Sequence, residues 1–178
     1  MTFNNLYSLI HESNAVRSYS CLMLNCNFLA NEIKEIQSEI CPCDVYDEEP
    51  GHGLETEFHA TALYGIHTDK LKEIRDKVQI KPVKIKFGKL SLFENEKYDV
   101  LKFDIISHDM VKLNKQLCEN IAYTNSYKDY KCHATVSYIQ HKKGKLYTSL
   151  KSKIIGKTYE CNTFVFSDKL ANKTYFIV

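Results

Sequence analysis

Two stretches of the chain carry the same chemically active side chains in the same order. The stretches are His59-Ala-Thr61-Ala-Leu-Tyr64-Gly-Ile-His67 and His133-Ala-Thr135-Val-Ser-Tyr138-Ile-Gln-His141. Five of the nine positions are identical. Each stretch reads as a β-strand, in which residues i and i+2 point to the same face, so each one places an imidazole beside a hydroxyl.

Two imidazoles and two hydroxyls are suited to cleaving a phosphodiester bond, and this chemistry requires no metal or other cofactor. If the two strands face one groove, a neutral histidine can take a proton from water or a ribose hydroxyl, and a protonated one can give a proton to the leaving oxygen. The hydroxyls would hold the non-bridging oxygens and stabilise the charge of the transition state. We therefore predict His59 and His133 as the acid–base pair, in either order, and Thr61 and Thr135 as the phosphate-holding residues.

The doubled motif resembles that of the two-histidine (2H) phosphoesterase superfamily, which includes 2'-5' RNA ligase-like proteins and RNA cyclic phosphodiesterases. Its longer forms H-A-T-A-L-Y and H-A-T-V-S-Y, with Ile154-Ile-Gly-Lys-Thr-Tyr159 downstream, are most similar to bacteriophage phosphodiesterases that destroy the cyclic oligonucleotide signals of CBASS immunity. The resemblance covers roughly Ser18 to Ser167. It implies an α+β fold that is bilobal and pseudo-twofold, with two antiparallel sheets lining a central groove and helices outside. Residues 1–178 would form this single two-lobed domain.

The resemblance implies an enzyme that hydrolyses cyclic di- or trinucleotide immune signals, as anti-CBASS proteins do. Its partner would be a cyclic oligonucleotide or a short RNA-like substrate. Within the superfamily, the alternative is an RNA 2',3'-cyclic phosphodiesterase or a 2'-5' RNA ligase-like enzyme. Outside enzymes, the alternatives are a non-catalytic cyclic-nucleotide sponge and a structural phage protein that uses the same fold. The sequence leaves base preference, linkage preference and oligomeric state open.

Five further residues are candidates for substrate contact. By analogy with the superfamily, Tyr19 at the start of the first predicted strand would stack on a base. Tyr64 and Tyr138 alternate out of phase with the histidines on an ideal strand, so they are packing residues unless the strand end twists one of them toward the groove. Lys142 and Lys143 follow the second motif, where a cationic turn meets either a substrate phosphate or only solvent.

Other reactive residues have simpler explanations. His67 and His141 fall in turns beyond the two strands, where we expect them to be exposed to solvent. The pair in Cys41-Pro-Cys43 matches no common zinc-site spacing, so we predict no metal site. A polar, tyrosine-rich loop follows the third predicted helix, and it could either stack on bases or anchor itself to the core. Its residues of interest are Tyr123, Tyr127, Lys128, Tyr130 and Lys131.

Composition excludes several other classes of protein. The chain has 178 residues, 44% of them hydrophobic and 26% charged, which is typical of one globular domain. A net charge of +2 is too small for a protein that tracks duplex DNA. No apolar window approaches the roughly 20 residues of a membrane span, and the N-terminus lacks a secretion signal. We therefore expect a cytoplasmic protein whose seven cysteines are free, reduced thiols.

Hydrophobic periodicity predicts about three helices and eight short strands in a mixed order. The segment from Cys41 to Glu57 has two prolines, two glycines and six acidic residues, so it is a loop that could close over a ligand as a lid. For the helix that follows the first motif, Thr68 or Asp69 is the expected N-cap. The predicted helices span residues 27–40, 68–78 and 110–121. The predicted strands span residues 18–25, 58–64, 83–93, 98–107, 132–139, 154–159, 162–167 and 174–178.

Overall fold

The computed structural model describes residues 19–124 and 129–178 of the chain. Its α-helices are α2 (Ala30–Ser38), α3 (Leu71–Lys77) and α4 (His108–Asn120). Short 3₁₀ turns cover Asn27–Leu29, Pro42–Asp44 and Gly144–Tyr147. The strands are β1 (Ser20–Asn25), β2 (His59–Ile66), β3 (Val83–Glu94), β4 (Tyr98–Ile106), β5 (His133–Gln140), β6 (Thr158–Cys161), β7 (Thr163–Ser167) and β8 (Lys173–Ile177).

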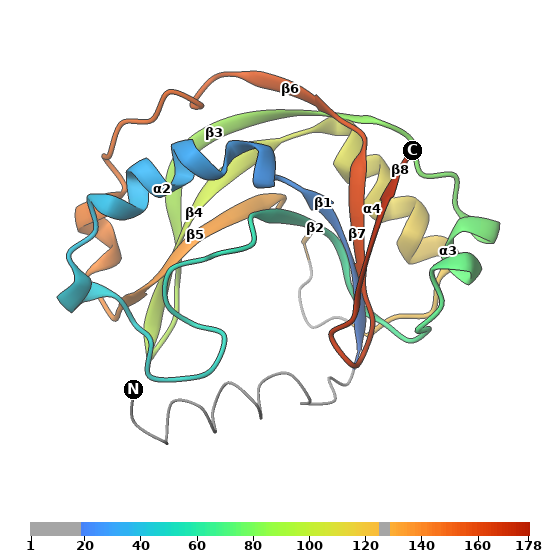
Figure 1. Ribbon diagram of the computed structural model, residues 1–178, viewed down its shortest axis with the longest axis horizontal. Coiled ribbons are helices and arrows are strands. Elements are labelled where there is room, and N and C mark those ends of the chain that lie inside the picture. Colours follow the sequence, from blue (N-terminus) through green and yellow to red (C-terminus); the bar gives the residue numbers. More distant parts are fainter. Residues whose placement is uncertain (1–18, 125–128) are drawn as a thin grey trace.

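All eight strands belong to one antiparallel sheet, in the order β6-β3-β4-β5-β2-β1-β7-β8. The sheet curls into a half-barrel that appears as an arch in Figure 1. The prediction of an α+β fold is confirmed, but the prediction of two separate sheets is wrong. The two halves join where β2 pairs with β5 through Ala60 and Ala134.

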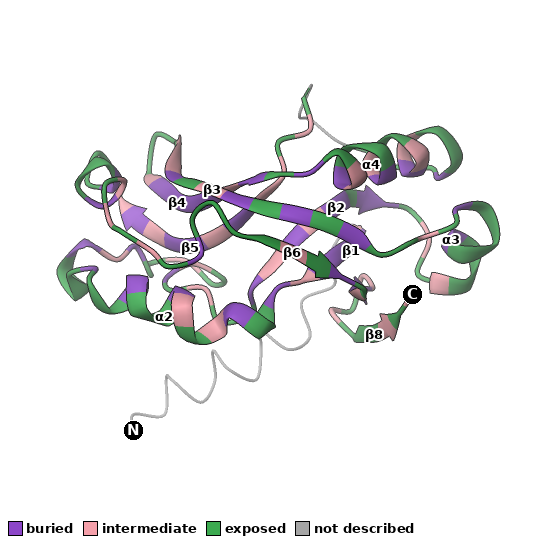
Figure 2. Ribbon diagram, turned by 90° about the horizontal axis from the view of Figure 1, so that it is seen from above, coloured by how far each residue is buried: buried purple, intermediate pink, exposed green. Residues whose placement is uncertain are grey.

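One face of this sheet is buried against helices and forms the core. Leu22, Ala60, Phe103 and Ala134 point to this face and are fully buried together with apolar residues of α2 and α4. In Figure 2, α2 lies at the lower left and α4 at the upper right, and the two helices cover different parts of this face. We call this side of the sheet the helix face. Because side chains alternate along a strand, the neighbours of these residues point to the other side.

Each of the two longer helices contacts a strand in the other half of the sheet. Helix α2 follows β1 in the chain but contacts β5, and α4 follows β4 and contacts both β3 of its own half and β2 of the other. Gln37 of α2 donates hydrogen bonds to the carbonyls of Glu55 (2.7 Å) and Val136 (2.8 Å). Asn114 of α4 donates to the carbonyl of Ala62 (2.7 Å). These contacts join the two halves at the point where β2 and β5 have few paired residues.

Most element boundaries follow the periodicity, and the exceptions have local causes. The predicted hairpin is present as β3 and β4. Helix α3 starts later than predicted, with Lys70 as its N-cap, because Asp69 instead accepts a hydrogen bond from Ser20 at 2.8 Å. Strand β6 begins at Thr158 and not at Ile154, because the intervening Gly156 has a positive φ of 83° and turns the chain.

The acidic loop from Cys41 to Glu57 is fastened to the edge of β5. Backbone hydrogen bonds join Tyr46 N to Tyr138 O (3.0 Å), Tyr138 N to Gly53 O (2.8 Å) and Glu55 N to Val136 O (3.1 Å). The loop thus occupies the edge that β5 exposes once it diverges from β2. In this structure it completes the sheet, and it does not take the position of a detached lid.

Candidate functional site

The two motifs meet at the junction of the sheet. Antiparallel residues that face one another point to the same side, and Ala60 and Ala134 both point to the helix face. Their neighbours on both strands therefore point to the opposite side, which we call the histidine face. These neighbours are His59, Thr61, His133 and Thr135, and all four are half-buried. The fold thus brings the four predicted catalytic residues together around one pair of alanines.

Both histidines are held in the same way. Nδ1 of His59 lies 2.6 Å from the carbonyl oxygen of Glu57, and Nδ1 of His133 lies 2.7 Å from that of Lys131. A carbonyl only accepts hydrogen bonds, so Nδ1 carries the proton in the neutral form of each ring. The remaining nitrogen, Nε2, is then the one that exchanges a proton.

Strands β2 and β5 each have a β-bulge, and both bulges fall at the same position of the motif. In β2, Thr61 pairs with Met23 and Leu63 with Leu22, which leaves Ala62 as the extra residue. In β5, Thr135 pairs with Lys102 and Ser137 with Leu101, which leaves Val136 as the extra residue. An extra residue shifts the alternation of every side chain that follows it.

Because of the bulges, both tyrosine side chains point to the same side of the sheet as the histidines. Tyr64 and Tyr138 follow their bulges by two residues and point to the histidine face, and Tyr64 is 48% exposed. The alternative that they are packing residues rested on ideal alternation, which the bulges break. Because β2 and β5 are antiparallel, the tyrosines lie on opposite sides of the alanine junction, each four residues or about 13 Å along its strand.

Helix side chains support both bulges. The bulged carbonyls of Ala62 and Val136 accept the hydrogen bonds from Asn114 and Gln37 described above. An amide from the crossing helix thus compensates for irregular backbone pairing in each half.

We expect Gln37→Leu to destabilise the fold, because the substitution removes two hydrogen bonds to carbonyls in the protein interior. The loss in the free energy of unfolding should be about 1–3 kcal/mol, measured by urea denaturation. Lys34→Leu, an exposed substitution on the same helix, is the control and should change it by less than about 0.5 kcal/mol. Equal stability of the two variants would contradict the support that we assign to Gln37.

An aromatic cluster surrounds each tyrosine. Tyr19 stacks on His67 with ring centroids 5.5 Å apart, and it meets Tyr64 edge-on at 6.4 Å. The ring of His52, from the acidic loop, lies 4.4 Å from that of Tyr138 and meets it edge-on. Tyr19 therefore lies beside Tyr64, and its role in base stacking stays a prediction. The exposure expected for His67 and His141 is also found.

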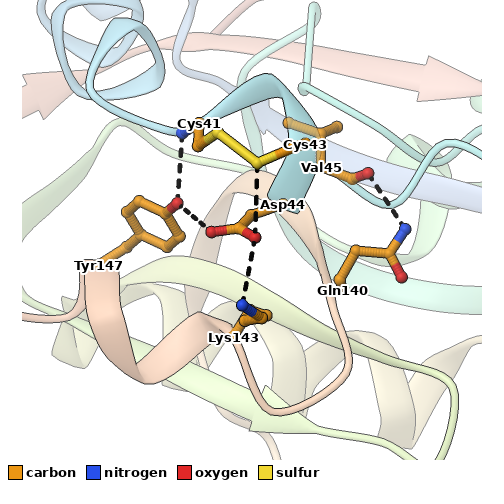
Figure 3. Close-up of a disulfide and its surroundings, with 7 residues drawn as sticks. All are labelled: Cys41, Cys43, Asp44, Val45, Gln140, Lys143 and Tyr147. Carbon is orange, nitrogen blue, oxygen red and sulfur yellow. Dashed lines mark hydrogen bonds and ion pairs between the residues drawn. A yellow bond between two sulfur atoms is a disulfide. The ribbon is translucent and has the colours of Figure 1, made fainter.

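The structure places Lys142 and Lys143 away from the histidines. They lie in the turn after β5, which ends five residues or about 17 Å beyond Thr135. Lys143 is 3.7 Å from a carboxylate oxygen of Asp44, as Figure 3 shows. Its charge is thus directed to the acidic loop, and the two lysines are not brought together with the four central residues.

Figure 3 also shows a disulfide between Cys41 and Cys43, so the prediction of reduced thiols is wrong for this pair. The Cα atoms are 5.3 Å apart, within the range that a disulfide can bridge. Tyr147 fixes this turn, since its hydroxyl accepts a hydrogen bond from the Cys41 amide (3.2 Å) and donates one to Asp44 (2.7 Å). Within the described part of the chain, no three His, Cys, Asp or Glu side chains are arranged to hold a metal ion.

The described residues on either side of 125–128 hold the tyrosine-rich loop to β2. Thr124 N donates to Gly65 O at 2.9 Å, and the Tyr130 hydroxyl donates to the carbonyl of Thr61 at 2.8 Å. Tyr130 therefore anchors the loop beneath one of the catalytic candidates. Tyr127 and Lys128, which were also considered for base stacking, lie outside the described residues.

Sequence reasoning missed a charged group beside His133. Lys102 is directly opposite Thr135 on β4, and Asp104 is opposite His133. Lys102 Nζ donates to Asp104 Oδ1 and to Ser91 Oγ, both at 2.7 Å. The sequence did contain a signal, since a lysine and an aspartate two residues apart interrupt the otherwise apolar strand Val100–Ile105.

The surroundings of His133 lower its pKa. Burial is the largest cause, the hydrogen bond to the carbonyl of Lys131 opposes it, and the positive charges of Lys102 and His59 lower the pKa further. His133 is therefore neutral at neutral pH. An influence of the His59 charge on His133 also agrees with the closeness that the strand register gives.

Comparison with known proteins finds a similar fold but establishes no function. No protein-family model matches the chain, and no curated protein matches it. The structure is similar to the crystal structure of TT0787 of Thermus thermophilus, with a TM-score of 0.56 and 13% sequence identity. The likeness covers 90% of this chain and 94% of that chain. At this identity it shows a shared α+β fold and nothing about activity.

One further finding concerns membranes. Among residues 19–124 and 129–178, no helix has the length and apolar character needed to cross a bilayer.

Proposed function

We propose that this protein is a metal-independent phosphodiesterase of the 2H type that hydrolyses cyclic di- or trinucleotides. The observation that carries the proposal is the Ala60–Ala134 pair, which places two imidazoles and two hydroxyls on one face of one sheet. The two histidines share one tautomer, fixed by carbonyls two residues earlier in the chain. The proposal assigns the two Nε2 nitrogens and the two hydroxyls to a single phosphorus centre.

In the proposed reaction, His133 acts first as the base because its lowered pKa keeps it neutral. Its Nε2 removes a proton from the attacking water as the new P–O bond forms. His59, protonated, gives a proton to the oxygen of the P–O bond that breaks. Thr61 and Thr135 donate hydrogen bonds to the non-bridging oxygens, where negative charge increases in the transition state.

The proposal includes an internal pseudo-twofold relation between the units β1–α2–β2 and β4–α4–β5. Both central strands carry the motif, the same histidine hydrogen bond and the same bulge. At both bulges, a backbone carbonyl accepts a hydrogen bond from a side-chain amide on the helix of the other unit. Such a relation would place one histidine and one threonine on each of two opposite walls of the site. This symmetry suits a phosphodiester, which joins two similar nucleosides.

Aromatic surfaces on both sides of the centre favour an oligonucleotide substrate. Tyr64 with Tyr19 lies on one side, and Tyr138 lies on the other. Bases stack on such rings with little dependence on sequence. A linkage flanked by two nucleosides would engage both sides at once. We place the activity in the cytoplasm of an infected host cell, where a phage enzyme would lower an immune signal.

A panel of substrates in EDTA tests the proposal. Purified protein is incubated with cyclic dinucleotides, cyclic trinucleotides and an RNA that ends in a 2',3'-cyclic phosphate, and the products are separated by chromatography. We expect turnover of a cyclic oligonucleotide. Turnover of the RNA end alone would replace the proposed substrate with an RNA one, and tight binding without turnover would identify a sponge. Neither binding nor turnover of any of the three would refute the proposal.

A further inference from the structure

The two halves of the site match at the motifs but differ on the strands beside them. On β1, Met23 is opposite Thr61 and Asn25 is opposite His59. On β4, the corresponding positions hold Lys102, opposite Thr135, and Asp104, opposite His133. One half therefore presents neutral side chains and the other presents a pair of opposite charges at the same register.

The next strand out continues this difference. On β7, Val165 pairs with Met23, and these two residues belong to a small apolar cluster with Cys21. On β3, Ser91 pairs with Lys102, and its hydroxyl donates to Asp104 Oδ1 at 2.6 Å. Beside the first motif, Met23 and Val165 thus form apolar contacts. Beside the second motif, the corresponding residues Lys102 and Ser91 form hydrogen bonds with each other and with Asp104.

Lys102 is unusually buried for a charged residue. It is only 4% exposed, and its ammonium lies 4.3 Å from the centre of the Phe93 ring. The edge-on contact of Phe93 with His133, at 4.8 Å between ring centroids, links the ammonium to the imidazole. A buried charge contributes little to stability once its desolvation is counted, so stability alone does not account for a lysine here.

We propose that Lys102 is a positioning residue that supplies a fixed positive charge to the β4–β5 half alone and thereby makes the two histidines unequal, an inference that rests on the proposed phosphodiesterase function. Lys102 is opposite Thr135 in the strand register, and its ammonium is held beside Ser91, Asp104 and the Phe93 ring that contacts His133. Asp104 and Ser91 keep the ammonium in place.

Several other charged groups surround His133, and they must be separated from Lys102. Asp104 faces it from β4 and His59 from β2, whereas Ser91 and Phe93 on β3 are uncharged. Burial alone would raise the pKa of the Asp104 carboxyl, but hydrogen bonds from Lys102 and Ser91 outweigh burial and lower it, so Asp104 is ionised. Lys131 precedes His133 in the chain, but its side chain is exposed.

The chain supplies its own replacements for a test, because Lys102→Met and Asp104→Asn copy Met23 and Asn25. Titration of His133 is followed by NMR of the imidazole in the free protein, which needs no substrate. Loss of the lysine charge should move the His133 midpoint to higher pH, whereas Asp104→Asn should move it to lower pH. Lys102→Arg should keep the original midpoint, and Lys131→Met, which removes an exposed charge, is the matched control.

Kinetics complete the test. In Lys102→Met, the acidic limb of the pH profile of kcat/KM should move to higher pH together with the NMR midpoint, and kcat/KM should fall by about tenfold or more. If Lys102→Met does not fold, the opposite shift in Asp104→Asn carries the test. An unchanged His133 midpoint in an active, folded Lys102→Met variant overturns this inference alone. The predicted midpoint shifts in a protein that cleaves no substrate would support the electrostatic role and overturn the proposed function.

Discussion

Replacing His59 or His133 by alanine is expected to lower the rate of cyclic oligonucleotide hydrolysis by at least about 10²-fold, the usual contribution of a positioned acid or base. Each variant loses one of the two proton-exchanging nitrogens that the Ala60–Ala134 pair brings to the same face. The two groups act in one step, so the double variant should be little slower than the slower single variant. Single-turnover rates at saturating substrate measure these effects without a contribution from product release.

The chain offers a control at a matched position. His141 follows the second motif strand, is exposed, and has Nδ1 2.8 Å from the carbonyl oxygen of Asn95. His141→Ala should therefore retain nearly full activity. Thermal unfolding of all variants separates loss of chemistry from loss of fold. Full activity in both His59→Ala and His133→Ala would remove the acid–base assignment.

The sequence was sufficient to find the four central residues but not to place them relative to one another. Each motif showed that an imidazole and a hydroxyl share one face of a strand, because that follows from local alternation. The pairing of β2 with β5 depends on Ala60 and Ala134, which are distant in the chain and are ordinary residues of apolar strands. No local pattern distinguishes this single sheet from the two sheets that were expected.

The surroundings of the central residues depend on long-range pairing in the same way. Ala62 and Val136 look like regular strand residues, and only the register with β1 and β4 shows that each is extra. The orientation of Tyr64 and Tyr138 followed from that register. Lys102 is different, because its position within an apolar strand was visible in the sequence. Its position beside the site depends on the pairing of β4 with β5, which sets Lys102 opposite Thr135.

Replacing Thr61 or Thr135 by valine should lower kcat by about 10²-fold, because each change removes a donor to oxygens that gain charge in the transition state. Valine keeps the branched shape that suits a strand, so the change isolates the hydroxyl. Serine at either position should restore most of the rate, since it returns the donor. Thr163→Val, at the start of β7, is the control outside the site and should have no effect. A rise in KM with unchanged kcat would show instead that the hydroxyls bind substrate and transition state equally, which would assign them to substrate holding and not to catalysis.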